Sequence, residues 1–343
     1  MLISPIIIDK ILYVNLHAEQ SFYGTFHADQ LDISKNIVTG IYAEELNLTI
    51  LENVLNFVKK NKSEFNVLVL EFQKLSTAQK NLYEVLNTIR NEMKFLILKN
   101  VNSIIIEKLL LNDCLGYFDN KTDTTFHDTF LLDEEARTKK HLVKEIKEVF
   151  DAEFKTKLDS ITIENTEKRI HHSSSVYLNK FIDIKKLIVD YKPLFLYSCY
   201  WLALEMNSKK LKRTWAIEKG SKITLLCQNL NSSFISSILS SFLLLDVITL
   251  DHIGPINKVY NEIESKINHG EEYLVISDVV CMGTEVRIAK NIIEFSGGKY
   301  IGNVCLIRIL PMELNEKYRD IESVFEITKT NNPINFKITT ALD

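Results

Sequence analysis

Short apolar runs alternate with helical stripes along the first part of the chain. Residues 6–14, 65–72 and 95–98 are dense in aliphatic and aromatic side chains and predict strands. Between residues 77 and 93 the apolar positions recur at helical spacing, at Leu82, Val85, Leu86 and Ile89. Residues 104–111 predict a further helix. This alternation favours an open sheet whose strands are joined by crossover helices.

The amino-acid composition changes after about residue 120, where charged residues become frequent. Within residues 132–158 the apolar side chains that share one helical face are Leu142, Ile146, Val149 and Phe150. We expect one long amphipathic helix that connects two domains or packs between them. A contact with a second copy of the chain and a plain linker are equally compatible with such a helix.

The second half returns to alternating strands and helices. Residues 223–227, 247–251, 273–276 and 300–310 predict strands, and Pro193 is placed to open a helix that covers residues 194–205. A polar loop at residues 228–233 precedes a helix with its inner face at Ile235, Ile238, Leu239 and Phe242. The pattern predicts a second α/β domain with a largely parallel sheet flanked by helices.

Length and composition agree with two α/β domains. The chain has 343 residues, of which 46% are hydrophobic and 25% are charged, as in ordinary globular proteins. We place a small domain at residues 1–120, a charged helical connector at 121–160 and a second domain at 161–343. The net charge of -4 argues against general attraction to nucleic acid or to anionic membranes, and no apolar run is long enough to span a bilayer.

The cysteines and histidines show no metal-site pattern. The five cysteines are scattered without a Cys-x-x-Cys pair, which fits a reducing compartment, so we expect a cytoplasmic protein without a zinc site.

The stretch YLVISDVVCMGTEVRIAKNIIEFSGG, residues 273–298, carries the clearest chemical signal. Its first four residues lack polar alternation, as expected for a strand buried on both faces, and Asp278 stands where this strand ends. Ligands bind at the carboxyl ends of strands in parallel sheets. A carboxylate there is able to accept hydrogen bonds from ribose hydroxyls or to approach Mg²⁺.

The loop after Asp278 leads into a helix that Gly297 and Gly298 are expected to end. Thr284 is the expected N-cap, and Gly283 allows the backbone to turn tightly. The loop would then present free N–H groups at the positive end of a helix, which suits a phosphate. The simpler interpretation is a plain strand–loop–helix crossover with an incidental Asp, because Gly and Asp are common in such loops.

The segment SDVVCMGTEVR, residues 277–287, resembles the phosphoribosyl-diphosphate signature of the type I phosphoribosyltransferases, in the form found in orotate phosphoribosyltransferase. Two upstream segments are similar to that enzyme in the same order: HSSSVYLNKFIDIKKLIVDYKPLFLYSCYWLALEM, and then ITLLCQNLNSSFISSIL, which matches a strand, the pyrophosphate loop and a helix. The resemblance covers about residues 171–310. It implies a protein that binds phosphoribosyl diphosphate, or a related ribose phosphate or nucleotide, together with Mg²⁺.

The resemblance also implies roles for individual residues. Asp278 would hold the ribose hydroxyls and approach the metal. The 5′-phosphate loop would be Cys281, Met282, Gly283, Thr284 and Glu285, and the diphosphate site would be lined by Asn231 and Ser232. Residues 252–270 would form the mobile catalytic loop, with Lys258 and Lys266 as its candidate catalytic cations.

Several positions depart from the family pattern. Ser277 stands where the family has the first of two acids, and Asn231 and Ser232 stand where orotate enzymes have Lys and Gly. Ser173 replaces a base-contacting Lys, so orotate itself is not the expected substrate. The ribose-phosphate cradle is thus retained, whereas the leaving-group machinery is depleted. Two functions follow: a phosphoribosyltransferase, or a non-catalytic nucleotide sensor that regulates a partner through the first domain.

The first domain is similar to the STAS module of anti-sigma-factor antagonists, through FNVLVLEFQKLSTAQKNLYEVLNTI and KFLILKNVN. In that family a Ser or Thr at the start of the helix is phosphorylated, and Ser76 and Thr77 lie at about that point. The Asp-Ser-Ser-Gly pattern of the family is absent. We therefore expect Ser76 or Thr77 to cap the helix.

Two further groups of residues have both a chemical and a plain interpretation. The basic cluster around Trp215 would suit nucleic acid, with the indole as a stacking surface, but a solvated face is the simpler interpretation. Cys281 would be a nucleophile if the helix N-terminus lowered the pKa of its thiol. Because no His or Asn stands at a recognisable spacing, we expect a small loop residue instead.

Overall fold

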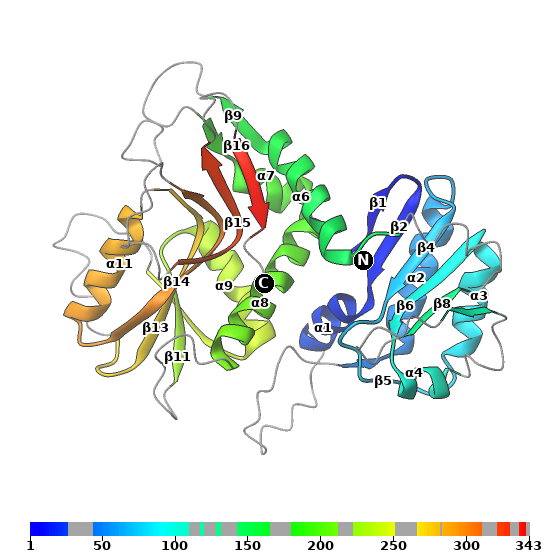
Figure 1. The fold of residues 1–343 in the computed structure, drawn as a ribbon. Coiled ribbons are helices and arrows are strands. Elements are labelled where there is room, and N and C mark those ends of the chain that lie inside the picture. Colours follow the sequence, from blue (N-terminus) through cyan, green and yellow to red (C-terminus); the bar gives the residue numbers. More distant parts are fainter. Residues whose placement is uncertain are drawn as a thin grey trace. The chain divides into compact units, whose positions relative to one another are not determined.

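The structure is a computed structural model that describes residues 1–26, 44–109, 117–119, 128–131, 143–164, 180–211, 222–250, 266–281, 283–310, 321–329 and 336–340. The chain divides into two compact units, of which the first runs to Phe154 and the second begins at Lys155 (Figure 1). Each unit has its own six-stranded sheet with helices, which confirms the predicted α/β class. Within the described ranges, no helix has the length and apolar character needed to cross a membrane.

The sheet of unit 1 has the order β1-β2-β4-β6-β8-β7. Its strands are β1 (Ile6–Ile8), β2 (Ile11–Asn15), β4 (Val67–Glu71), β6 (Phe95–Val101), β7 (Tyr117–Asp119) and β8 (Asp128–Leu131). The central strands β2, β4 and β6 are parallel, as expected for strands joined by crossover helices. The strands outside them run antiparallel, so the sheet is mixed.

The helices of unit 1 cover one face of this sheet with apolar side chains. They are α1 (Leu16–Phe26), α2 (Leu48–Asn61), α3 (Tyr83–Glu92) and α4 (Ser103–Lys108). Helices α2 and α3 pack against each other (Figure 1). Their buried residues, such as Leu51 and Leu86, form a single core with Leu68, Leu70 and Leu96 of the sheet. Burial of this apolar face is the main source of stability for unit 1.

Residues 6–14 do not form one strand. The chain turns at Asp9 and Lys10, which have φ angles of 53° and 62°, and β1 pairs with β2 as an antiparallel hairpin. A two-residue turn with both φ angles positive matches the twist of the strands on either side of it. Because the residues before and after the turn are apolar, the hydrophobicity pattern alone does not indicate the turn.

The helix expected over residues 77–93 begins later than predicted. Thr77 and Ala78 form β5 (Thr77–Ala78), which pairs with β3 (Glu45–Leu46), and α3 begins only at Tyr83. The hydroxyl of Thr77 accepts a hydrogen bond from Lys108 Nζ at 2.5 Å. The expectation that Ser76 or Thr77 caps the helix is therefore wrong, because the N-cap is Leu82, without a side-chain cap bond.

The expected long helix over residues 132–158 begins later than predicted. Helix α6 (Ile146–Ile161) starts after a non-helical segment at residues 143–145, and residues 132–142 lie outside the described ranges. The boundary between the two units falls within α6.

The sheet of unit 2 has the order β12-β11-β13-β14-β15-β16. Its strands are β11 (Ile223–Cys227), β12 (Asp246–Thr249), β13 (Glu272–Val280), β14 (Lys299–Leu310), β15 (Ile321–Lys329) and β16 (Phe336–Thr340). All pairs are parallel except β15 with β16 at the edge. This sheet confirms the predicted parallel, helix-flanked architecture of the second domain.

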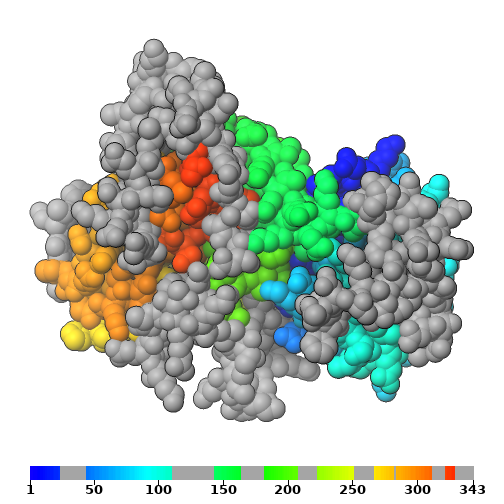
Figure 2. Space-filling model, in the orientation of Figure 1, coloured from blue at the N-terminus to red at the C-terminus, as the bar shows by residue number. Residues whose placement is uncertain are grey.

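The helices of unit 2 lie on both faces of its sheet. They are α7 (Ile184–Asp190), α8 (Lys192–Leu211), α9 (Leu230–Leu243) and α11 (Thr284–Phe295), and a small hairpin pairs β9 (Thr162–Glu164) with β10 (Lys180–Ile182). Pro193 lies in the first turn of α8, as predicted. Figure 1 shows α11 on one side of the sheet and α8 and α9 on the other. Helix α11 reaches the molecular surface, where it is orange in Figure 2.

The core of unit 1 provides a test of this packing. Leu51 of α2 is completely buried in the core that this helix forms with the sheet. Leu51→Ala should therefore lower the free energy of unfolding by about 3 kcal/mol. Glu52→Ala, on the exposed face of the same helix, is the matched control and should change it by less than about 0.5 kcal/mol. Urea denaturation followed by circular dichroism measures both. Equal effects of the two substitutions would contradict the assigned core face.

Candidate functional site

The candidate site begins with a difference in strand length in unit 2. The pairing of β11 with β13 ends at Cys227, opposite Ile276. Strand β13 continues along β14 to Val280, which pairs with Arg308. Asp278 therefore lies in an overhang that has a neighbouring strand on one side only. This places it at the carboxyl edge of the parallel sheet, where ligands bind in folds of this class.

Asp278 is half-buried, and both of its carboxylate oxygens are held by neutral donors. Asn231 Nδ2 donates a hydrogen bond to Asp278 Oδ2 at 2.8 Å, and the backbone N–H of Val279 donates to Oδ1 at 2.9 Å. Asn231 lies in the first turn of α9. Two predicted site residues that are 47 positions apart in the chain thus meet at one point. Their contact orients the carboxylate without placing a cation on it.

The N-terminus of α11 lies directly after this overhang. Its N-cap residue is Gly283, which is left-handed with φ 63° and makes no side-chain cap bond. The first helical bond runs from the Arg287 N–H to the Gly283 carbonyl at 3.0 Å. Thr284 is the first residue of the helix, so its prediction as the N-cap is wrong. A glycine cap leaves the first N–H groups of the helix without a side-chain acceptor, which is the arrangement that suits an anion.

The N-terminus of α9 is closed by its own side chains. Asn229 Oδ1 accepts from the Ser232 N–H at 2.8 Å, and the Ser232 hydroxyl accepts from the Asn229 N–H at 3.1 Å, which together form a capping box. Ser232 is fully buried. Its hydroxyl thus serves the helix cap, whereas Asn231 points to Asp278.

Glu285 brings a second carboxylate toward Asp278. The side chain of Gln228 donates to the Glu285 carbonyl at 3.4 Å, which ties the two loops together. Glu285 is exposed as a residue, but partial desolvation of its carboxyl group raises its pKa, and the negative charge of Asp278 raises it further. The sequence pattern indicated Gln228 only as the first residue of a polar loop that follows a buried strand, not as a site residue.

Ser277, where the resemblance implies an acid, has a structural role. Successive side chains of a strand point to opposite faces, so Ser277 lies on the face opposite to Asp278. Its hydroxyl accepts a hydrogen bond from Asn303 Nδ2 at 2.9 Å, and the same amide donates to the Val275 carbonyl at 3.1 Å. Ser277 is buried. It therefore links β13 to β14 and contributes nothing to the exposed edge.

The remaining predicted residues differ in how they are placed. Lys266 Nζ donates to the Thr249 carbonyl at 3.4 Å, at the carboxyl end of β12. Lys258 and Met282 lie outside the described residues, as do Ser173 and Trp215. Cys281 is a free, half-buried thiol whose pKa is raised by burial. A raised pKa disfavours the thiolate and agrees with the expectation of a loop residue.

A metal ion at this edge would need ligands from outside the protein. Among the described side chains, no group of three or more His, Cys, Asp or Glu residues could hold a metal ion. At this edge Asp278 offers a carboxylate that two hydrogen bonds already orient. Such a single ligand fits Mg²⁺ that is bound mainly by the phosphates of a ligand.

Comparisons with known proteins found local similarity to phosphoribosyltransferases. No family model matches the chain. Adenine phosphoribosyltransferase of Petrotoga mobilis (strain DSM 10674 / SJ95) is 32% identical over 56 residues, which are 16% of this chain and 32% of that protein. The chain thus spans about a third of the length of this relative.

Solved structures of the same class overlap with about half of the chain. Adenine phosphoribosyltransferase from Thermoanaerobacter pseudethanolicus has a TM-score of 0.35 and 16% identity, over 50% of this chain and 98% of that one. Orotate phosphoribosyltransferase from Aeropyrum pernix has a TM-score of 0.32 and 14% identity, over 46% and 81%. These values are too low to assign the chain to a family, so its function has to be inferred from the site.

The capping box of α9 provides a test of how Asn231 is positioned. Asn229→Ala removes the acceptor for the Ser232 N–H and should lower the free energy of unfolding by about 1 kcal/mol. Ser237→Ala, at an exposed position of the same helix, is the control and should have no destabilising effect. Chemical denaturation measures both variants. An unchanged stability of Asn229→Ala would contradict the capping role.

Proposed function

We propose that the carboxyl edge of the unit 2 sheet binds a ribose phosphate, as phosphoribosyl diphosphate or a nucleotide, and that the protein transfers its phosphoribosyl group to a base. One observation carries this proposal: Asp278, oriented by Asn231 and Val279, stands beside a helix N-terminus that has only glycine as its cap. A vicinal diol and a phosphate on one ligand would satisfy both features. The local identity with an adenine phosphoribosyltransferase supports the same ligand class.

Each part of the site has a distinct chemical task in this proposal. Asp278 accepts hydrogen bonds from the ribose hydroxyls, and the main chain from Cys281 to Glu285 holds the 5′-phosphate. Both donors to Asp278 are neutral, and among the described residues no cation forms an ion pair with it, so its charge is available to the ligand. Mg²⁺, bound by the ligand phosphates, would supply charge neutralisation for the leaving pyrophosphate. Asn231 lines the diphosphate side, and Lys266 is the described lysine of the predicted catalytic loop.

A non-catalytic sensor is the second candidate. The first turn of α9 presents no basic side chain, its cap is closed by Asn229 and Ser232, and Ser277 replaces an acid. The missing basic side chain and the missing acid affect departure of pyrophosphate more than they affect binding of the ribose. A sensor would bind the ligand without turnover and act on a partner through the first domain, whose STAS-like character stays a prediction, as does a homodimer.

Substitution of Asp278 separates these possibilities. Asp278→Asn should weaken binding of phosphoribosyl diphosphate by about ten- to a hundredfold, because it removes a charged acceptor for the ribose hydroxyls. Isothermal titration calorimetry with Mg²⁺ measures the affinity, and pyrophosphate release with a panel of purine and pyrimidine bases measures turnover. Asp246→Asn, at the opposite end of the same sheet, is the control.

The outcomes of this experiment are distinct. Pyrophosphate release that is lost in Asp278→Asn supports the transferase, whereas tight binding without release supports the sensor. If neither phosphoribosyl diphosphate, ribose 5-phosphate nor a nucleoside monophosphate binds, both functions are excluded.

Glu285 tests the charge balance of the phosphate loop. Its carboxylate lies near the N–H groups that would hold the phosphate, so Glu285→Gln should strengthen binding of ribose 5-phosphate by about two- to fivefold. Because desolvation and Asp278 raise the pKa of Glu285, the gain should be smallest at low pH, where Glu285 is protonated, and should grow as pH rises through that pKa. Glu294→Gln, in the last turn of the same helix, is the control. Weaker binding by Glu285→Gln would show that the carboxylate is itself a ligand contact.

A further inference from the structure

A row of polar side chains crosses the carboxyl edge of the unit 1 sheet. In the strand register Asn15 of β2 lies beside Glu71 of β4, which lies beside Lys99 of β6. The preceding row on the same face is apolar apart from one hydroxyl, and consists of Tyr13, Val69 and Ile97. The polar row therefore places an acid and a base on neighbouring strands at the end of a buried face.

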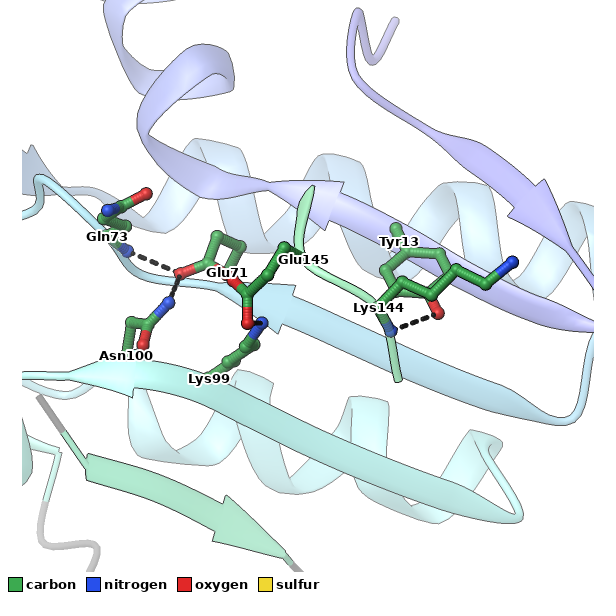
Figure 3. A network of polar contacts seen from close by, with 7 residues as sticks. All are labelled: Tyr13, Glu71, Gln73, Lys99, Asn100, Lys144 and Glu145. Atoms are coloured by element: carbon green, nitrogen blue, oxygen red, sulfur yellow. Dashed lines mark hydrogen bonds and ion pairs between the residues drawn. The ribbon is translucent and has the colours of Figure 1, made fainter. Parts of the chain in front are cut away.

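Glu71 is buried, and neutral groups donate hydrogen bonds to one of its two carboxylate oxygens. Its Oε1 accepts from Asn100 Nδ2 at 2.7 Å and from the Gln73 N–H at 3.0 Å (Figure 3). Only 1% of the residue is exposed. A carboxylate removed from water to this degree is costly to ionise unless charged partners compensate.

The segment that precedes α6 is anchored over the same face. The Lys144 N–H donates to the Tyr13 hydroxyl at 3.2 Å, above β2, and Glu145 Oε1 forms an ion pair with Lys99 Nζ at 2.6 Å, above β6 (Figure 3). The Glu145 carbonyl accepts from the Val149 N–H at 3.1 Å, the first turn of α6. Glu145 thus takes part both in the ion pair with Lys99 and in the first turn of α6.

Lys99 interacts with two carboxylates of different exposure: it pairs with Glu145 and lies beside Glu71 in the strand register. Its side chain is 13% exposed, whereas that of Glu145 is 65% exposed and Glu71 is buried. The groups that face Glu71 are Lys99 and Asn100 from β6, Gln73 from its own loop, Glu145 from the segment before α6, and the neutral Asn15 from β2. Within the described residues, Lys99 is therefore the cation that both acids share.

We propose that Glu71, Lys99 and Glu145 form a proton-sensitive clasp that holds the start of α6 on the unit 1 sheet when Glu71 is neutral and loosens it when Glu71 is ionised. Ionised Glu71 attracts Lys99 into the low-dielectric face and repels Glu145. Both effects weaken the ion pair between Lys99 and Glu145. Because that pair is partly in solvent, it is the weaker of the two competing interactions.

Glu71 changes its protonation state close to neutral pH. Burial raises the pKa of Glu71 to about 7, and Glu145 adds to the rise, while Lys99, Asn100 and Gln73 oppose it. Burial also raises the pKa of Tyr13, which therefore stays neutral over this range. The clasp is closed below about pH 7 and loosens as pH rises through that value.

Hydrogen exchange of the full-length protein tests the clasp. Exchange in peptides that cover residues 145–154 is followed by mass spectrometry from about pH 5.5 to 8.5, with correction for the intrinsic exchange rate. In the unmodified protein, protection of the first turn of α6 should fall by about two- to fivefold as pH rises, which corresponds to loss of one partly exposed ion pair. Glu71→Gln, which retains the acceptor for Asn100 and Gln73, should keep the low-pH protection throughout.

Two further variants make the experiment decisive. Glu145→Gln should reduce protection at every pH and remove the pH dependence, because the ion pair is lost. Glu84→Gln, at an exposed position of α3, should behave like the unmodified protein. The clasp is refuted if Glu71→Gln retains the pH dependence, or if Glu145→Gln leaves protection unchanged. If Glu71→Gln does not fold, as judged by circular dichroism, a pH dependence that survives in Glu145→Gln refutes it alone.

Discussion

The overhang of β13 beyond β11 is the constraint from which the candidate site of unit 2 follows. Up to Ile276 the strand has a partner on both sides, and side chains there are enclosed by helices. Beyond Ile276 only β14 remains as a partner, so the first turn of α9 is able to approach the strand from its open side. Asn231 makes this approach and fixes Asp278. The carboxylate is thereby oriented by hydrogen bonds, half-exposed and next to the start of α11.

The two sheets place acids at the same end of their parallel strands but treat the charge differently. In unit 2 the acid Asp278 is held by an amide and a backbone N–H, and no cation in the described part of the chain forms an ion pair with it. In unit 1 a lysine lies beside the buried acid Glu71, and a second acid competes for it. A carboxylate without a described cation partner at a partly exposed edge is suited to bind a ligand. A buried carboxylate that shares a lysine with a second acid is suited to change its protonation state.

Helix N-termini show a similar contrast within unit 2. At α9 the side chains of Asn229 and Ser232 satisfy the terminal groups, and at α11 the N-cap is a glycine that has no side chain to offer. Both helices follow a central strand of the sheet, so the difference lies in the cap residues alone. A single sheet edge thus carries one closed and one open helix terminus. The open terminus is the one next to Asp278, which is why we propose the phosphate subsite at residues 281–285.

The sequence alone determined the α/β class and the parallel strands β2, β4, β6 and β11 to β14, because runs of apolar residues and their spacing are local properties. It placed Asp278 at the end of its strand, whereas β13 continues past it to Val280. It did not determine the turn at Asp9 and Lys10, whose apolar flanks look like one strand, or the role of Ser232, whose hydroxyl closes a cap. The pairing of Asn231 with Asp278 and the row formed by Asn15, Glu71 and Lys99 were decided only by the tertiary structure. These residues are far apart in the chain, and they meet because strand register and overhang place them together, which no local pattern of side chains encodes.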